Sequence, residues 1–407
     1  MNEIGIEYLN IYGGSMALDQ RALATARERD PERVVNDFLI QARSLNPTWE
    51  DTVTMAANAA MPLLDFVKRE DIGLLVVGTE GSVDFGKPIS SNVHSALELP
   101  SNVRNFETKF ACYSGIAALE TAINWVASGR NRGKKALVIS SDFSRMHLNM
   151  MEEFVLGGLA AAAIVGNDPG VFALDDGIRG TWTSDVYDTF RPSARHEVGN
   201  NEVSLYTYMD ALEGAWADYL EQNRVDFDRD FEYLLYHTPF PGMAFQAHRT
   251  VCNLVERRKK SEVRDDFDRR VLPGLRVAQQ VGSTYGASNF AGLVSLLGGQ
   301  NPPIPGSRIG LFAYGSGAIG EFYSGTIGKQ AADRVGQMRI DEKLAARRSI
   351  DVPAYEEIEK RRTSHIEAPE FTPDFDLPPQ LFEEHYRGSG RLVLKSVKDF
   401  YRNYERA

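Results

Sequence analysis

The sequence is poor in cysteine, in basic residues and in long apolar runs. Only two cysteines occur among its 407 residues, too few for a disulfide framework or a four-cysteine zinc site. Acidic residues outnumber basic ones by 56 to 45, and the formal net charge of -11 argues against broad binding to nucleic acids or anionic membranes. No apolar run approaches the roughly 20 residues of a membrane-spanning helix, and the first residues lack a secretory pattern. These absences predict a cytoplasmic protein that binds neither nucleic acid nor membrane.

What the chain does contain is an alternation of apolar segments and helical patterns, which is typical of layered α/β proteins. Buried strands are predicted at residues 73–78, 135–140, 160–165, 233–237 and 308–313. Helices are predicted at residues 52–67, 114–127, 206–222, 243–258 and 287–297. At 407 residues the chain exceeds the usual size of one compact core, so two core-sized parts are expected.

The two parts repeat one order of elements. In the first, a strand ends at Glu80, a turn of small residues containing Cys112 opens a helix, and a strand follows. In the second, a strand ends at His237, a turn containing Ser283 opens a helix, and a strand follows. This order predicts an internal duplication, in which two βαβ halves are related by a pseudo-twofold axis and the functional site lies between them.

Three regions follow from the duplication. Residues 1–170 form the first half, residues 171–328 the second, and residues 329–407 an extension. Within the extension, the charged residues 329–363 are predicted to form exposed helix, whereas four prolines between residues 367 and 380 exclude regular helix. The remainder is predicted to be a helix that docks on the body or on a partner.

Cys112 is the best candidate for a nucleophile. It lies in Phe110-Ala-Cys-Tyr-Ser-Gly, where small residues lead into an amphipathic helix. A thiol at a helix N-terminus faces unpaired N–H groups and the positive end of the helix dipole, which favour the reactive thiolate and could hold an oxyanion. The alternative is a cysteine that packs as a small apolar residue, which is our interpretation of Cys252 in its helical segment. No group of histidine and cysteine has the spacing of a metal site.

Two polar residues follow strongly apolar strands. His237 could donate a hydrogen bond to a carbonyl or transfer a proton, and the alternative is a histidine at the edge of the core with a backbone partner. Partial desolvation of Glu80 would raise its pKa and make it a better base, and the alternative is a turn acid or helix cap. Gly315-Ser316-Gly317 could hold an oxyanion with its backbone amides or form a tight turn, but it lacks the lysine of a nucleotide-binding P-loop.

Taken together, these segments resemble the 3-hydroxy-3-methylglutaryl-CoA synthase family over roughly residues 1–328. The motifs that carry the resemblance are Gly-Thr-Glu80, Ala-Cys112-Tyr-Ser-Gly, His237-Thr-Pro-Phe, Tyr314-Gly-Ser-Gly and Glu321-Phe-Tyr-Ser-Gly. Val83-Asp-Phe-Gly-Lys-Pro, and Cys-Tyr-Ser-Gly in place of Cys-Tyr-Gly-Gly, look closer to the polyketide β-branching synthases than to the mevalonate-pathway enzymes.

The resemblance implies a homodimer of thiolase fold, with its halves in a layered α-β-α-β-α arrangement. Cys112 would take an acyl group from a donor acyl carrier protein, and Glu80 would deprotonate the α-carbon of that group. His237 would polarise the β-ketone of an acceptor intermediate on a second acyl carrier protein, and hydrolysis would release the product. The phosphopantetheine of the carrier proteins bears both substrates, and neither a further cofactor nor a metal is implied.

The resemblance also implies a substrate pocket lined by Tyr187, Ser283, Gly315 and Ser316. A separate prediction concerns the carriers, whose surfaces are typically acidic in this resemblance. Arg249, Arg257 and Arg258 cluster on and after one predicted helix, and they are predicted to form a basic patch at the mouth of the pocket. The alternative is an ordinary solvated helix end.

Two departures from the family pattern affect the substrate prediction. Ser283 stands where the family usually has asparagine, and Glu80-Gly81-Ser82 replaces Glu-Ser-Gly. Either departure could mark another acyl donor, such as propionyl. Three alternatives stay open: a mevalonate-pathway synthase using acetyl-CoA and acetoacetyl-CoA, a β-ketoacyl synthase of the same fold, and a non-catalytic scaffold that binds an acyl carrier protein. Glu80 and Ser283 count against the β-ketoacyl synthase.

Overall fold

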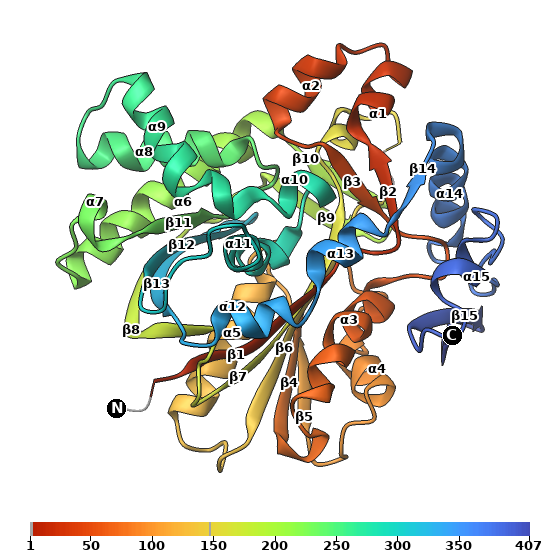
Figure 1. Cartoon of the computed structure of the whole chain (residues 1–407). Helices are drawn as coiled ribbons and strands as arrows, with labels where there is room; N and C mark the ends of the chain where they lie inside the picture. Colours follow the sequence, from red (N-terminus) through yellow and green to blue (C-terminus); the bar gives the residue numbers. More distant parts are fainter. Residues whose placement is uncertain (1–2, 146–147) are drawn as a thin grey trace.

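Nine strands form the largest sheet of the computed structural model, which describes residues 3–145 and 148–407 (Figure 1). Their order across the sheet is β11-β12-β13-β8-β1-β7-β6-β4-β5. The strands are β1 (Gly5–Tyr12), β4 (Ile72–Gly78), β5 (Arg104–Thr108), β6 (Lys135–Phe143), β7 (Gly158–Gly166), β8 (Phe172–Thr183), β11 (Tyr233–Tyr236), β12 (Arg308–Gly315) and β13 (Ile319–Ile327). β1 and β8 are joined through only two residue pairs, so the sheet consists of two units that meet at this seam.

The helices repeat in the two units. α3 (Thr52–Ala60) precedes β4 and α6 (Asn201–Gln222) precedes β11, whereas α5 (Ser114–Ala127) precedes β6 and α11 (Ser288–Leu297) precedes β12. α3 packs on β1, β6 and β7, and α6 packs on β8 and β13, so each covers one unit from outside. α5 and α11 lie between the units, and every residue of α11 is buried (Figure 1). The predicted duplication and the α-β-α-β-α layers of a thiolase-like fold are therefore confirmed.

Local sequence explains where these central elements begin and end. Asp51 caps α3 by accepting from the backbone N–H groups of Val53 and Thr54, both at 3.0 Å. The helix ends at Ala60, earlier than predicted, because Pro62 lacks an N–H group, and a 3-10 turn from Met61 to Asp65 follows. No helix within the described ranges is long and apolar enough to cross a membrane.

The extension corrects two predictions. Its first part is not one helix but α12 (Ala331–Gly336), α13 (Ile340–Ala345), β14 (Arg348–Ile350) and α14 (Val352–His365). β14 pairs with β2 (Met16–Asp19), which pairs with β3 (Ala42–Leu45). After α15 (Leu381–His385), the predicted terminal helix is instead a hairpin of β15 (Leu392–Lys398) and β16 (Tyr401–Arg406). Its tight turn has positive φ at Asp399 and Phe400, as two-residue hairpin turns require.

The hairpin returns the end of the chain to the first half. The side-chain amide of Asn58 on α3 accepts from the backbone N–H of Leu392 at 2.8 Å and donates to its carbonyl at 3.1 Å. Trp49 packs against the rings of Phe375, Phe382 and Tyr386, so the extension is part of the core rather than a loose tail.

Candidate active site

The site forms where the central helices of the two halves begin. A Cβ atom on Gly115 of α5 would overlap the carbonyl oxygen of Gly286, just before α11, so only glycine lets the two helix starts approach this closely. The turn that follows β12 meets the same region, because a Cβ on Gly315 would lie 2.6 Å from the Cβ of Tyr113. The predicted turn Gly315–Gly317 therefore packs against the loop that carries Cys112.

Cys112 and Glu80 are in direct contact. The thiol of Cys112 donates to Oε2 of Glu80 across 3.4 Å, and both residues are only partly buried, so substrate can reach them. Burial and the Glu80 carboxylate raise the pKa of the Cys112 thiol well above its usual value. The prediction that the helix start favours the thiolate is therefore wrong, because desolvation and an adjacent negative charge outweigh the helix dipole. The site therefore holds a thiol that donates a hydrogen bond to the carboxylate of Glu80.

A buried carboxylate fixes the loop of Glu80. Oδ1 of Asp142, at the end of β6, accepts from Oγ1 of Thr79 at 2.7 Å and from the backbone N–H groups of Glu80 and Gly81, both at 3.0 Å. Burial raises the pKa of Glu80, as predicted, with Arg191 acting in the opposite direction. Burial and Glu80 raise the pKa of Asp142 well above its usual value. Two acids thus lie side by side where proton transfer is expected.

Arg191 supplies the compensating charge. It lies on β9 (Thr189–Ser193), which pairs with β10 (His196–Gly199), and these strands fall in a polar segment that the sequence did not predict to be extended. Its guanidinium pairs with Glu197 and donates to the carbonyl of Glu80 at 3.4 Å. A fixed cation therefore lies beside the carboxylate that is expected to act as base.

His237 lies in different surroundings. It is only 2% exposed; its backbone N–H donates to the carbonyl of Phe312 at 2.7 Å, and its carbonyl accepts from the Tyr208 hydroxyl at 2.7 Å. Its ring lies 6.4 Å from the ring of Tyr208 and 6.2 Å from that of Tyr314. Burial lowers the pKa of His237 to about 3, so the ring is neutral at physiological pH and keeps one N–H donor. The neutral ring can therefore donate one hydrogen bond, for example to a ketone.

Asp188 holds the turn after β12 and was not predicted. Its Oδ2 accepts from the Tyr314 hydroxyl at 2.6 Å, and its Oδ1 accepts from the backbone N–H of Gly317 at 2.9 Å. Asp188 is fully buried, whereas the neighbouring Tyr187 is 74% exposed and its ring lies edge-on to Phe190. The pocket-lining role of Tyr187 stays a prediction.

The predicted substrate residue Ser283 and the predicted carrier-binding arginines differ in burial and in their partners. Ser283 is buried immediately before the turn that leads into α11, with its backbone N–H donating to the carbonyl of Val155 at 2.9 Å. Arg249 lies exposed on α8 (Met243–Val255), and Arg257 is exposed just beyond the end of that helix. Arg258 pairs with Asp228 and its side chain is only 16% exposed, so it is committed to an internal ion pair rather than a free patch.

Two further features near α8 are not substrate sites. His248, Cys252 and Asp266 place three potential metal ligands within 4.8 Å of one another, although the sequence showed no such spacing. The guanidinium of Arg270 already lies 3.1 Å from Oδ2 of Asp266, where a metal ion would have to sit.

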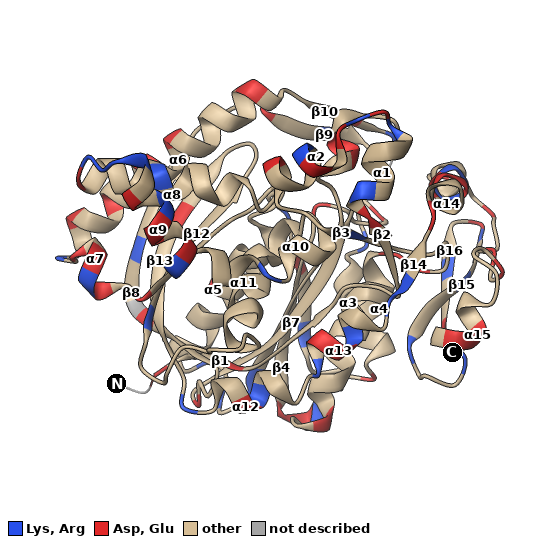
Figure 2. Cartoon of the chain, turned by 45° about the horizontal axis from the view of Figure 1, so that its top comes forward, with Lys and Arg blue, Asp and Glu red and all other residues tan. Residues whose placement is uncertain are grey.

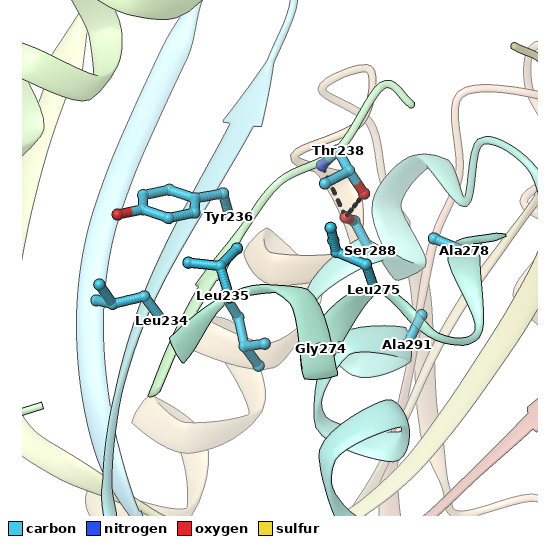
Figure 3. Close-up of a pocket in the computed structure, with 11 residues that line it drawn as sticks. Leu234, Leu235, Tyr236, Thr238, Gly274, Leu275, Ala278, Ser288 and Ala291 are labelled. Carbon is cyan, nitrogen blue, oxygen red and sulfur yellow. Dashed lines mark hydrogen bonds between the residues drawn. The ribbon is translucent and has the colours of Figure 1, made fainter. Parts of the chain in front are cut away.

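Behind β11, a cavity of about 10 Å³ is bordered by Thr238 and by Ser288, whose hydroxyl accepts from the Thr238 backbone N–H (Figure 3). It has room for one water molecule at most.

Comparison with known proteins agrees with this geometry. Residues 1–168 match the N-terminal model of hydroxymethylglutaryl-coenzyme A synthase, and residues 245–406 match the C-terminal model. The chain is 36% identical to the polyketide biosynthesis 3-hydroxy-3-methylglutaryl-ACP synthase PksG of Bacillus subtilis (strain 168), over 99% of each chain. It belongs to the hydroxymethylglutaryl-CoA synthase family.

Solved structures give the same assignment. The HMG synthase of the curacin biosynthetic pathway superposes with a TM-score of 0.94 at 38% identity and 100% coverage of both chains. MvaS in complex with 3-hydroxy-3-methylglutaryl coenzyme A gives a TM-score of 0.88 at 32% identity, also over both whole chains. As a member of this family, the protein is an acyltransferase that forms a carbon–carbon bond.

Proposed function

We propose that this synthase performs polyketide β-branching on carrier-bound substrates. The contact between Cys112 and Glu80 is the observation that carries the chemical part of the proposal, and the neutral ring of His237 is the proposed hydrogen-bond donor. Similarity over the whole chain to PksG, and to the curacin pathway synthase that has been solved with its donor carrier protein, supports acyl carrier proteins as substrate carriers. The carrier phosphopantetheine is then the only prosthetic group that the reaction needs.

The first step is acylation of Cys112. Glu80 takes the thiol proton across their hydrogen bond while sulfur attacks the donor thioester, and the proton passes to the departing carrier thiol. This returns Glu80 to the carboxylate. Since a thioester is kept, the α-protons of the acyl group stay acidic enough for a carboxylate base with a raised pKa to remove one.

The second step is condensation. The enolate attacks the β-ketone of the acceptor, and His237 stabilises the developing alkoxide through its ring N–H, because burial keeps the ring neutral. The proton held by Glu80 then neutralises the alkoxide. Water finally cleaves the thioester to Cys112, which regenerates the thiol and leaves the branched product on the acceptor carrier.

Carrier docking and dimerisation complete the proposal. Arg249 and Arg257 are exposed and suit an acidic carrier surface. Arg258 is not included in the proposed docking surface, because it already pairs with Asp228. β5 is the outer strand of the sheet and pairs with β4 on one side, so its other edge is available to the same strand of a second copy. We propose a homodimer through that edge.

Intact mass tests the donor. The full chain would be exposed separately to acetyl-carrier, propionyl-carrier and acetyl-CoA. A mass gain from a carrier thioester supports the proposal, and a larger gain from propionyl than from acetyl supports the hypothesis that Ser283 and Gly81 mark a different donor. Acylation by acetyl-CoA alone would favour the mevalonate-pathway alternative, and no acylation by any donor would favour the scaffold.

A further inference from the structure

A cleft outside the active site is lined with positively charged side chains. It has a volume of about 290 Å³ and lies where α13 meets the start of β2 and the segment after α15. Figure 1 shows α13 where the chain passes from the body towards α14 and α15. The cleft is lined by the side chains of Arg339, Lys343, Arg347, His385 and Arg391, together with Glu342. They come from three separate stretches of the chain, so folding assembles the group.

Arg347 carries a positive charge and has no acidic partner among the residues that the structure describes. Its guanidinium donates to the Leu344 carbonyl at 3.0 Å, to the Ser44 hydroxyl at 2.8 Å and to the Gln280 carbonyl at 2.9 Å, all of them neutral acceptors. Burial lowers the pKa of Arg347 to about 10, because removing the charged guanidinium from water is unfavourable. These hydrogen bonds fix the guanidinium at the wall of the cleft.

Lys343 and Arg391 add two further cations with unused donors. Within the described ranges the side chain of Lys343 makes no hydrogen bond or ion pair, and burial together with Arg391 and Arg339 lowers its pKa. The guanidinium of Arg391 lies over the rings of Tyr12 and Tyr386, at 5.7 Å and 5.4 Å, and its buried Nη1 has no partner in the described part of the chain. A buried, unpaired guanidinium nitrogen is costly unless a ligand accepts from it.

Nearby acids offset only part of the charge of the cleft. Glu342 is bonded to Arg339. The buried Glu50 accepts from the hydroxyls of Tyr12 and Tyr386 and from the amide of Asn46, and it also interacts with the charge of Arg391. Among the described residues, no acid pairs with the side chains of Arg347 and Lys343. The protein as a whole carries a formal net charge of -11, so a local positive excess is a property of this cleft and not of the composition.

We propose that the cleft binds a small molecule bearing a diphosphate group. Arginine and lysine together suit phosphoryl oxygens, and several uncompensated cations suit more than one negative charge. The volume is near the lower limit of about 300 Å³ for small-molecule sites and exceeds what one inorganic ion fills. Arg347 also holds the carbonyl of Gln280, three residues before Ser283, but the binding proposal does not depend on the proposed reaction.

Calorimetry with inorganic pyrophosphate on the full chain, at fixed ionic strength, tests the site. We expect one site per chain and binding weakened at least about tenfold by Lys343→Glu. Lys360→Glu is the matched control, because Lys360 is an exposed lysine on α14 and the substitution changes the net charge equally. Absence of binding to the wild type, or equal weakening by the two substitutions, would overturn the proposal.

Two further measurements keep the result interpretable. Lys343→Met removes the charge without adding a negative one, and unfolding curves of all variants separate lost binding from lost folding. Sulfate that binds as tightly as pyrophosphate would reject a diphosphate site in favour of a general anion site. Adenosine diphosphate that binds more tightly than pyrophosphate supports the site and identifies a nucleoside diphosphate, whereas weaker binding supports the diphosphate group alone.

Discussion

β4 and β11 occupy equivalent positions in the two halves, yet the residues that follow them have opposite surroundings. Glu80, after β4, contacts a thiol, lies beside Asp142 and Arg191, and has a raised pKa because it is desolvated. His237, after β11, lies among aromatic rings, and burial lowers its pKa to about 3. Burial acts on both groups, and in both it favours the uncharged form.

The same order of strand and helix therefore places two residues with different proposed roles, a base after β4 and a hydrogen-bond donor after β11. In the proposed mechanism the first half supplies a nucleophile and a base, and their thiol and carboxylate are joined by a hydrogen bond next to the guanidinium of Arg191. The second half supplies His237 as a neutral hydrogen-bond donor. Charged residues are also unevenly spread over the molecule, and many lie on its outer helices (Figure 2).

Cys112→Ala should have the largest effect. We expect no acylation and a loss of turnover of at least about 10⁴-fold, because the covalent intermediate cannot form. Intact mass after exposure to acyl-carrier measures it. Cys252→Ala is the matched control, since Cys252 is fully buried beside His248 and Asp266, the latter on α9 (Lys260–Arg270). If only Cys252→Ala lost the added mass, the acyl group would be carried by Cys252 in the second half, and the prediction for Cys112 would be wrong.

Glu80→Gln and His237→Asn should separate the two halves. Glu80→Gln is expected to acylate more slowly, to abolish exchange of the α-protons with deuterated water in the acyl-enzyme that forms, and to slow turnover by about 10² to 10⁴-fold. His237→Asn should retain that exchange but lose about 10² to 10³-fold in condensation, because only the ketone loses its donor. Mass spectrometry of the acyl-enzyme measures exchange, and product formation measures condensation. Equal loss of exchange in both variants would contradict the division of tasks.

Much of this arrangement follows from local sequence, and the rest does not. The strand ends before Glu80 and His237 and the helix after Cys112 are set by neighbouring residues, so they could be predicted. The raised pKa of the Cys112 thiol depends on Glu80, which is 32 positions away in the sequence and reaches it through folding. Asp142 did leave a signal, because Ser-Ser-Asp ends a third apolar strand.

The Arg191–Glu197 pair and the terminal hairpin left weaker signals. Both lie in short strands whose extended form depends on what they pack against: the Glu80 loop for β9, and α3 with Trp49 for β15. Strand preference is set by such contacts more than by composition. The sequence alone therefore did not reveal these strands, and the end of the chain was wrongly predicted to be a helix.

The pH dependence of stability should have opposite signs in the two halves. The folded pKa of His237 is about 3 against 6.5, so unfolded chains bind more protons between these values and stability falls as pH falls below about 6.5. The full shift corresponds to about 5 kcal/mol of the free energy of unfolding.

Glu80 has a raised pKa, so the free energy of unfolding should fall as pH rises above 4.5, where the unfolded chain loses this proton more readily than the folded one. Denaturant unfolding from pH 4 to 8 should show a weaker acid loss in His237→Gln and a gain at pH 7 in Glu80→Gln. Parallel curves for both variants and the wild type would refute the assignment.

The smallest effect is expected at the carrier-docking surface. Arg257→Glu should weaken binding of the donor carrier about three- to tenfold and reduce its dependence on salt, because Arg257 is exposed and acts through long-range attraction. Arg258→Glu should instead lower the free energy of unfolding, because it breaks the pair with Asp228 and brings a carboxylate close to Asp266. Surface plasmon resonance at two salt concentrations, together with denaturant unfolding, distinguishes them. If Arg257→Glu leaves carrier binding unchanged at low salt, α8 is not the docking helix, and the second half contributes to the reaction only through His237 and the turn after β12.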